Sequence, residues 1–104
     1  MAQMNMQKMM QQARKMQEEV TKAQEEVQLL EAEGTAGGGV VKVVASGDGR
    51  IKKVTIDPDA IDPEDAGMLE DLVLAATNEA LGNVGDLAQM RMNAATGGFN
   101  LPGF

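Results

Sequence analysis

The sequence predicts an α+β fold, in which two long helices flank a small antiparallel sheet. Residues 1–33 and 63–96 carry small and apolar residues at helical spacing, whereas residues 34–57 are rich in Val and Ile and contain glycine turn signals. The chain has 104 residues, which fits one domain over residues 1–104. Residues 97–104 are predicted to form a flexible tail.

The first predicted helix carries an unbroken heptad stripe. Small or apolar residues recur at alternating spacings of three and four, at Met6, Met9, Ala13, Met16, Val20, Ala23, Val27 and Leu30. No Pro or Gly occurs before Gly34, where the helix is expected to stop. Such a stripe is typical of a coiled-coil seam, and the polar remainder of the helix indicates that it needs a partner helix. The chain's own last helix is a candidate partner.

Three short strands are expected after the first helix. Residues 31–36 could form a short first strand, residues 40–46 and 50–57 are rich in Val and Ile, and residues 37–39 are three glycines. The glycines could in principle cradle a phosphate, but no Lys-Ser or Lys-Thr follows them and the next element reads as a strand. They are therefore predicted to form a hairpin turn.

The second hairpin is predicted to turn at Asp48-Gly49, a strong two-residue hairpin signal. A turn of this length fixes the register of the two strands. It places Val43 opposite Val54, Val41 opposite Ile56 and Ala45 opposite Lys52. One face of the hairpin is then apolar enough to pack against another element.

The second long helix is predicted to begin with Asp62 as its N-cap and Pro63 at its first position. Its small and apolar residues also follow a seven-residue spacing, with Asn83 filling one position; they are Leu69, Val73, Ala76, Ala80, Leu87, Met90 and Ala94. Gly82 and Gly85 weaken the middle of this helix.

The composition excludes several kinds of function. The chain has no Cys and no His, so most zinc sites, cysteine nucleophiles and Ser-His triads are absent, and we predict no catalytic residues, metal or cofactor. With two Phe and no Trp or Tyr, base stacking on an aromatic platform is not expected. Neither a signal peptide nor a membrane span is recognisable, which favours a cytoplasmic protein without a small-molecule substrate.

The acidic residues between the sheet and the second helix could suggest a calcium site. They are Asp57, Asp59, Asp62, Glu64 and Asp65. An EF-hand loop that began at Asp57 would need Gly at position 62 and Glu at position 68, where the chain has Asp and Met. Capping and turn formation are therefore the favoured roles of these carboxylates.

Charge is distributed unevenly along the chain, whose net charge is −7. The first seventeen residues have a charge of +3 from Lys8, Arg14 and Lys15, whereas residues 18–33 have a charge of −5 and residues 57–79 hold eight acids and no base. A helix with bases near its N-terminus and acids near its C-terminus opposes its own macrodipole. This arrangement suggests a function at the free tip of the helix.

Lys8, Lys15 and Lys22 recur every seven residues and form one stripe outside the seam. On charge alone, the commoner interpretation is a solvated stripe whose bases pair with Glu residues three or four positions away. That interpretation leaves Lys8 without an acid within four residues. The alternative is a phosphate-binding stripe. The bases at residues 50–53 have the same two interpretations, and a solvated strand is again the commoner one.

The whole chain resembles the YbaB/EbfC family. The most specific points of likeness are the strand exit Ile56-Asp57-Pro58, the helix segment Met68-Leu69-Glu70-Asp71-Leu72-Val73-Leu74-Ala75-Ala76 and the ending Leu101-Pro102-Gly103-Phe104. The resemblance implies a bacterial nucleoid-associated protein with an α-β-β-β-α protomer. It also implies a homodimer joined through its sheet region, whose projecting helices form a tweezer-like pair of arms around duplex DNA.

The family's DNA contacts lie on basic residues of the terminal helices. The resemblance carries this role over to Lys8, Arg14, Lys15, Lys22 and Arg91. The preferred hypothesis is thus a non-enzymatic, nucleoid-associated protein that binds double-stranded DNA with weak sequence preference and contributes to nucleoid organisation or gene regulation. The rival hypothesis is a coiled-coil scaffold or chaperone-like protein whose Met-rich arm grips other proteins. An enzyme that uses the acidic cluster is a weaker third option.

Overall fold

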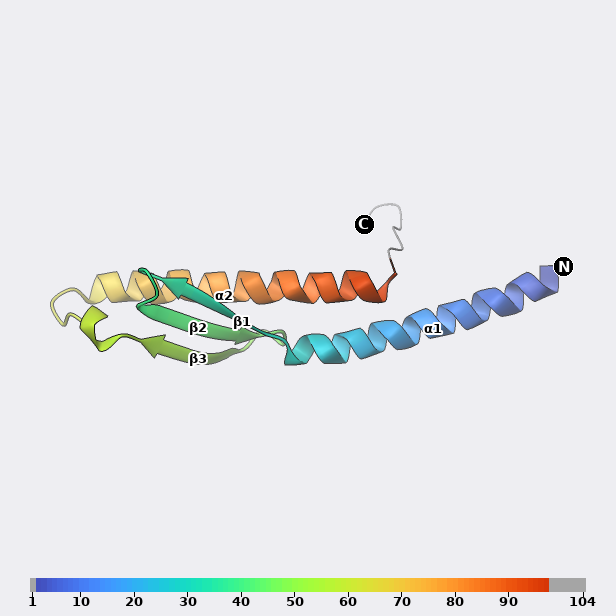
Figure 1. Cartoon of the computed structure of the whole chain (residues 1–104), viewed down its shortest axis with the longest axis horizontal. Helices are drawn as coiled ribbons and strands as arrows, with labels where there is room; N and C mark the ends of the chain where they lie inside the picture. Colours follow the sequence, from blue (N-terminus) through green and yellow to red (C-terminus); the bar gives the residue numbers. More distant parts are fainter. Residues whose placement is uncertain (1, 98–104) are drawn as a thin grey trace.

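The computed structural model describes residues 2–97, and the predicted tail from residue 98 onward lies outside the described residues. The elements in chain order are α1 (Ala2–Leu29), β1 (Glu31–Ala36), β2 (Val41–Ser46), β3 (Ile51–Ile56), the short 3-10 helix η1 (Pro58–Ala60) and α2 (Ala66–Ala95). The predicted α-β-β-β-α order is confirmed. The molecule is elongated, 77 × 24 × 16 Å, because α1 points away from the rest (Figure 1).

The three strands form an antiparallel sheet in the order β1-β2-β3, and α2 lies across β1 and β2. Alternate residues of β2 point toward α2, so Val41, Val43 and Ala45 are buried whereas Lys42 is exposed. They pack against small residues of α2, with Ala76, Ala80 and Val84 completing the core. The core is small, and it joins one helix to two strands.

Gly34 lies inside β1, not at the end of the first helix. The prediction of a helix to residue 33 is wrong, since α1 ends at Leu29 and Glu31–Ala36 pairs with β2. A Cβ on Gly34 would lie 2.2 Å from the Ala80 nitrogen and 2.3 Å from the Ala76 oxygen. Gly34 is therefore what allows the backbone of α2 to approach β1 this closely.

The β2–β3 hairpin forms at the predicted place but with a longer turn. Val43 pairs with Val54 and Val41 with Ile56, as predicted. Ala45, however, pairs with Ile51, and Lys52 is the extra residue of a β-bulge. The two-residue turn is wrong, because the Ser46 N–H donates to the Arg50 carbonyl and leaves three residues in the loop, with Gly49 at φ 83°.

The second helix begins three residues later than predicted. Asp65 is its N-cap, and the Asp65 side chain accepts a hydrogen bond from the Met68 N–H at 3.3 Å. Asp62 instead accepts from the Glu64 N–H in the preceding turn. Asp62 and Asp65 are both good capping residues three positions apart, and local sequence did not distinguish them.

The buried face of α2 departs from the predicted seven-residue spacing after Ala80. The next contact positions are Val84, Ala88, Arg91 and Ala95, whereas the predicted Asn83, Leu87, Met90 and Ala94 are exposed. A straight helix has 3.6 residues per turn, so its contact face moves by about 20° per heptad against a repeat of 3.5. The observed positions follow this drift.

Candidate nucleic-acid interface

The helix α1 has two halves with different surroundings. From Met16 to Val27 its seam residues are buried or half-buried against the C-terminal part of α2, so the predicted partner helix is the chain's own α2. Beyond the end of α2, α1 continues alone (Figure 1). There Met6 and Met9 are 65% and 67% exposed. The seam thus finds a partner within this chain along its inner half, from Met16 inward, and none along its outer, projecting half, residues 5–15.

An ion pair that was not predicted from the sequence joins the inner half of α1 to the C-terminal part of α2. The Arg91 Nε donates to Glu26 Oε2 at 2.6 Å. This hydrogen bond and the guanidinium charge hold the pKa of Glu26 below its ordinary value. No local signal could have identified the pair, because 65 residues separate its members.

The predicted DNA-contacting bases of α1 are all exposed, but they do not share one face. Lys8, Lys15 and Lys22 run along one flank of the seam, about 10.5 Å apart. Arg14 directly precedes Lys15, so it lies about 100° around the helix from the Lys stripe. Arg14 and Lys22 border a shallow surface depression together with Glu18 and Glu25, so positive and negative charges alternate there.

The predicted pairing of these bases with nearby Glu residues is not found in the described part of the chain. Between residues 2 and 97 the structure contains two ion pairs, Arg50 with Asp48 at 3.6 Å and Arg91 with Glu26. Neither pair includes a base of α1. Lys8 and Lys15 therefore present their charge on the projecting half of the helix, while Arg91 is engaged with a carboxylate.

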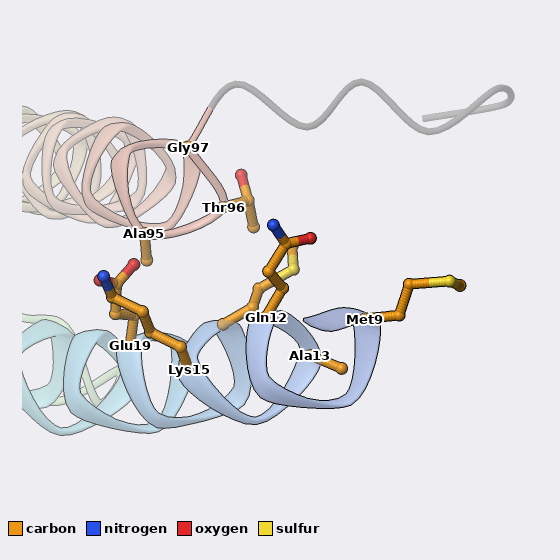
Figure 2. A pocket seen from close by; sticks show the side chains of 9 residues that line it. Met9, Gln12, Ala13, Lys15, Glu19, Ala95, Thr96 and Gly97 are labelled. Atoms are coloured by element: carbon orange, nitrogen blue, oxygen red, sulfur yellow. The ribbon is translucent and has the colours of Figure 1, made fainter. Parts of the chain in front are cut away.

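A groove lies where α2 ends beside α1. Its volume is about 640 Å³, and it lies between about three turns of α1, from Met9 to Glu19, and the end of α2 (Figure 2). The side lined by α1 includes the seam residues Met9, Ala13 and Met16, and Ala95 and Gly97 line the other side. The side chains of Lys15 and Glu19 reach up from α1 toward Ala95. The groove is apolar in its floor and charged along one rim.

The acidic segment before α2 serves local structure. Asp57 accepts from the Asp59 N–H at 3.0 Å, and Asp62 and Asp65 have similar backbone partners. This confirms the predicted capping role. Within residues 2–97 no group of acidic side chains is arranged to hold a metal ion. In the same range, no helix is both long and apolar enough to span a membrane.

Comparison with known proteins gives a consistent match over nearly the whole chain. The model of the YbaB/EbfC DNA-binding family matches residues 1–99. A nucleoid-associated protein of Staphylococcus carnosus is 57% identical over 99 residues, which cover 95% of this chain and 94% of the relative. A nucleoid-associated protein of Desulforamulus reducens is 50% identical over the same shares of both chains.

A solved structure supports the fold independently. The crystal structure of an uncharacterized protein, HP0035 of Helicobacter pylori, superposes with a TM-score of 0.58 at 23% identity. The match covers 72% of this chain and 87% of that one. At this identity the likeness concerns the fold alone, and it agrees with the predicted architecture.

Proposed function

Because the chain belongs to the YbaB/EbfC DNA-binding family, we propose that it is a nucleoid-associated protein that binds duplex DNA through the projecting half of α1. The observation that carries this proposal is the exposure of Lys8, Arg14 and Lys15 on a helix that extends beyond α2. A projecting helix can approach a duplex while the acidic end of the molecule, residues 57–79, stays away from it.

The proposed mechanism is electrostatic. Lysine and arginine side chains that contact phosphates release counterions, and this release supplies affinity that does not depend on base sequence. In the described residues no aromatic side chain is available to stack on bases, which supports backbone contacts and weak sequence preference. Lys22 extends the same stripe inward. These bases would hold the protein on the duplex without reading its sequence.

Arg91 has a different place in this proposal. Its Nε is already hydrogen-bonded to Glu26, and a phosphate would have to compete with that carboxylate. We therefore propose that Arg91 contributes mainly by fixing α1 against α2, so that the outer half of α1 projects at a defined angle. Any contact of Arg91 with DNA would be made by the remaining guanidinium nitrogens.

A homodimer is proposed on the basis of an uncovered apolar surface. Because α2 lies across β1 and β2, the side chains of Ile51 and Val54 on β3 stay 42% and 46% exposed, although they point to the same side of the sheet as the core. β3 is also an edge strand, which isolated proteins usually protect.

The neighbouring flank of α2 extends this surface. Asn83 donates to the Glu33 carbonyl and Leu72 lies beside Gly37, so these two residues mark the side of α2 that faces β1. Leu74 and Leu81 lie on the opposite flank by helical geometry, above β3, and both are exposed. A second copy that brings the same surface would bury these residues in a two-fold interface. Two projecting arms would then act together in a tweezer-like pair.

The proposal is tested by reversing the charge of the arm, by which we mean the projecting half of α1. The variant Lys8→Glu/Arg14→Glu/Lys15→Glu should weaken binding to a fluorescent duplex by roughly tenfold or more at physiological salt, because three phosphate contacts per copy are replaced by repulsion. The matched control is Lys42→Glu/Lys52→Glu/Lys53→Glu, which changes the net charge equally but on the sheet. Equal losses in both variants would mean that overall charge, not the arm, determines affinity. Unchanged binding in the arm variant would refute the proposed site and favour a scaffold role.

A further inference from the structure

The groove at the end of α2 is an apolar recess of about 640 Å³, and the polypeptide leaves α2 at its edge. The last helical residue, Ala95, lines the groove together with Thr96 and Gly97. Gly97 has a φ of 62°, a left-handed conformation that ends the helix and turns the chain. The next residues therefore start beside the recess.

The sequence that follows is apolar enough to fill it. Residues 98–104 contain Phe99, Leu101 and Phe104, and the two Phe are the chain's only aromatic residues. The floor of the groove is formed by Met9, Ala13 and Met16. Methionine sulfur makes favourable contacts with aromatic rings, and the flexible methionine side chain adapts its shape to them.

We propose that residues 98–104 of the same chain occupy this groove and cover the exposed Met seam of α1. Seven residues span up to about 24 Å when extended. The seam from Met16 to Met6 is about 15 Å long on a helix that rises 1.5 Å per residue. The tail is thus long enough to cover the outer seam.

The order of residues in the tail fixes where each ring goes. Phe99 is two residues beyond Gly97, so it reaches only the inner part of the groove, near Met16. Phe104 is seven residues beyond Gly97 and reaches Met9 or Met6. Binding within one chain is favoured by a high effective concentration. The tail would thereby shield the seam from other helices and leave Lys8 and Lys15 at its rim.

The test uses methyl NMR spectra of the full chain with ¹³C-labelled methionine methyls, recorded without DNA so that the outcome is independent of the proposed function. An aromatic ring that packs on a methyl group shifts its resonance upfield. Phe99→Ala should move the Met16 methyl signal toward its random-coil position, and Phe104→Ala should move that of Met9. Met68 and Met90, which are exposed elsewhere on α2, are the internal controls and should not move.

The conservative variants Phe99→Leu and Phe104→Leu separate packing from the ring effect. They should abolish the upfield shifts while preserving the hydrogen-exchange protection of α1 amides near Ala13. If both Ala variants leave the Met9 and Met16 signals unchanged, the groove does not hold the tail and the proposal is overturned.

A mixing experiment identifies which chain supplies the tail. Labelled protein that ends at Gly97 is combined with unlabelled full-length protein, and the Met9 and Met16 methyl signals are compared with those of the labelled truncated protein alone. The proposal expects no change, because each tail stays on its own arm. A return of the upfield shifts would show that a second copy donates its tail, and would overturn the proposal.

Discussion

Arg91 on α2 donates a hydrogen bond from its Nε to Glu26 Oε2 on α1 at 2.6 Å, and this is the ion pair that links the two long helices within the described residues. It lies in the inner half of α1, where the seam residues pack against the C-terminal part of α2. The direction of the arm therefore depends on a contact between residues from opposite ends of the chain.

The Glu26–Arg91 pair predicts a pH-dependent contribution to stability. Because the pKa of Glu26 is lowered in the folded protein, its contribution is fully present above the ordinary glutamate pKa of 4.5 and is lost as pH falls through the lower folded pKa. Glu26→Gln should lower the melting temperature slightly at pH 7 and by less at pH 3. The effect is small because both side chains are at least a third exposed. Glu25→Gln, an exposed neighbour, is the control and should have no effect at either pH.

Gly34 predicts a large loss of stability on a minimal substitution. Gly34→Ala would place a methyl group against the backbone of α2 and should cost about 3 kcal/mol or more, which lowers the melting temperature by roughly 12 °C or more. The matched control is Gly82→Ala, at a helical position with open space, which should stabilise by about 0.5–1 kcal/mol. Thermal unfolding followed by circular dichroism distinguishes the two. A Gly34→Ala protein as stable as the wild type would contradict the close approach of α2 and β1.

The start of α2 can be located by removing its cap. Asp65→Ala should destabilise the protein by about 1 kcal/mol, because the Met68 N–H loses its partner. Asp62→Ala removes a hydrogen bond in the preceding turn and should cost less. Urea unfolding of both variants gives the comparison, and a larger cost for Asp62→Ala would place the helix start where the sequence alone predicted it.

The proposed dimer interface predicts a change in molecular mass. Val54→Glu/Leu81→Glu places charges in the apolar surface between β3 and α2 and should convert the dimer to a folded monomer. Met68→Glu, an exposed apolar position outside this surface, should leave the mass unchanged. Light scattering after size-exclusion chromatography measures both. A monomeric wild-type protein, or a double variant that stays dimeric, would refute this interface.

Much of the fold could be predicted from local patterns. The α-β-β-β-α order followed from periodicity and glycine turns, and the pairing of Val43 with Val54 followed from the hairpin signal. The end of α1 was predicted in two conflicting ways, as a helix to residue 33 and as a strand over residues 31–36, because Glu-Ala-Glu at residues 31–33 favours helix locally. Their strand conformation comes from pairing with β2 beneath α2, a tertiary effect. The bulge at Lys52 was not predicted either, because it accompanies a three-residue turn where the sequence predicted a two-residue turn.

The candidate site was only partly predictable. The exposure of Lys8, Arg14 and Lys15 followed from the polar character of the first helix outside its seam. The engagement of Arg91 with Glu26 did not, since it depends on how α2 packs against α1. The family match agrees with the predicted DNA-binding class rather than an enzyme.

The salt dependence of duplex binding tests the central claim most directly, because its slope counts phosphate contacts. Wild-type protein should lose affinity linearly in log–log coordinates as salt rises. The neutral variant Lys8→Gln/Arg14→Gln/Lys15→Gln should reduce the magnitude of the slope by about 3 if one arm is engaged and about 5 if two are, at about 0.9 per contact. Lys42→Gln/Lys52→Gln/Lys53→Gln should leave the slope unchanged. A slope that is the same in the arm variant and the wild type would contradict DNA binding through the projecting half of α1.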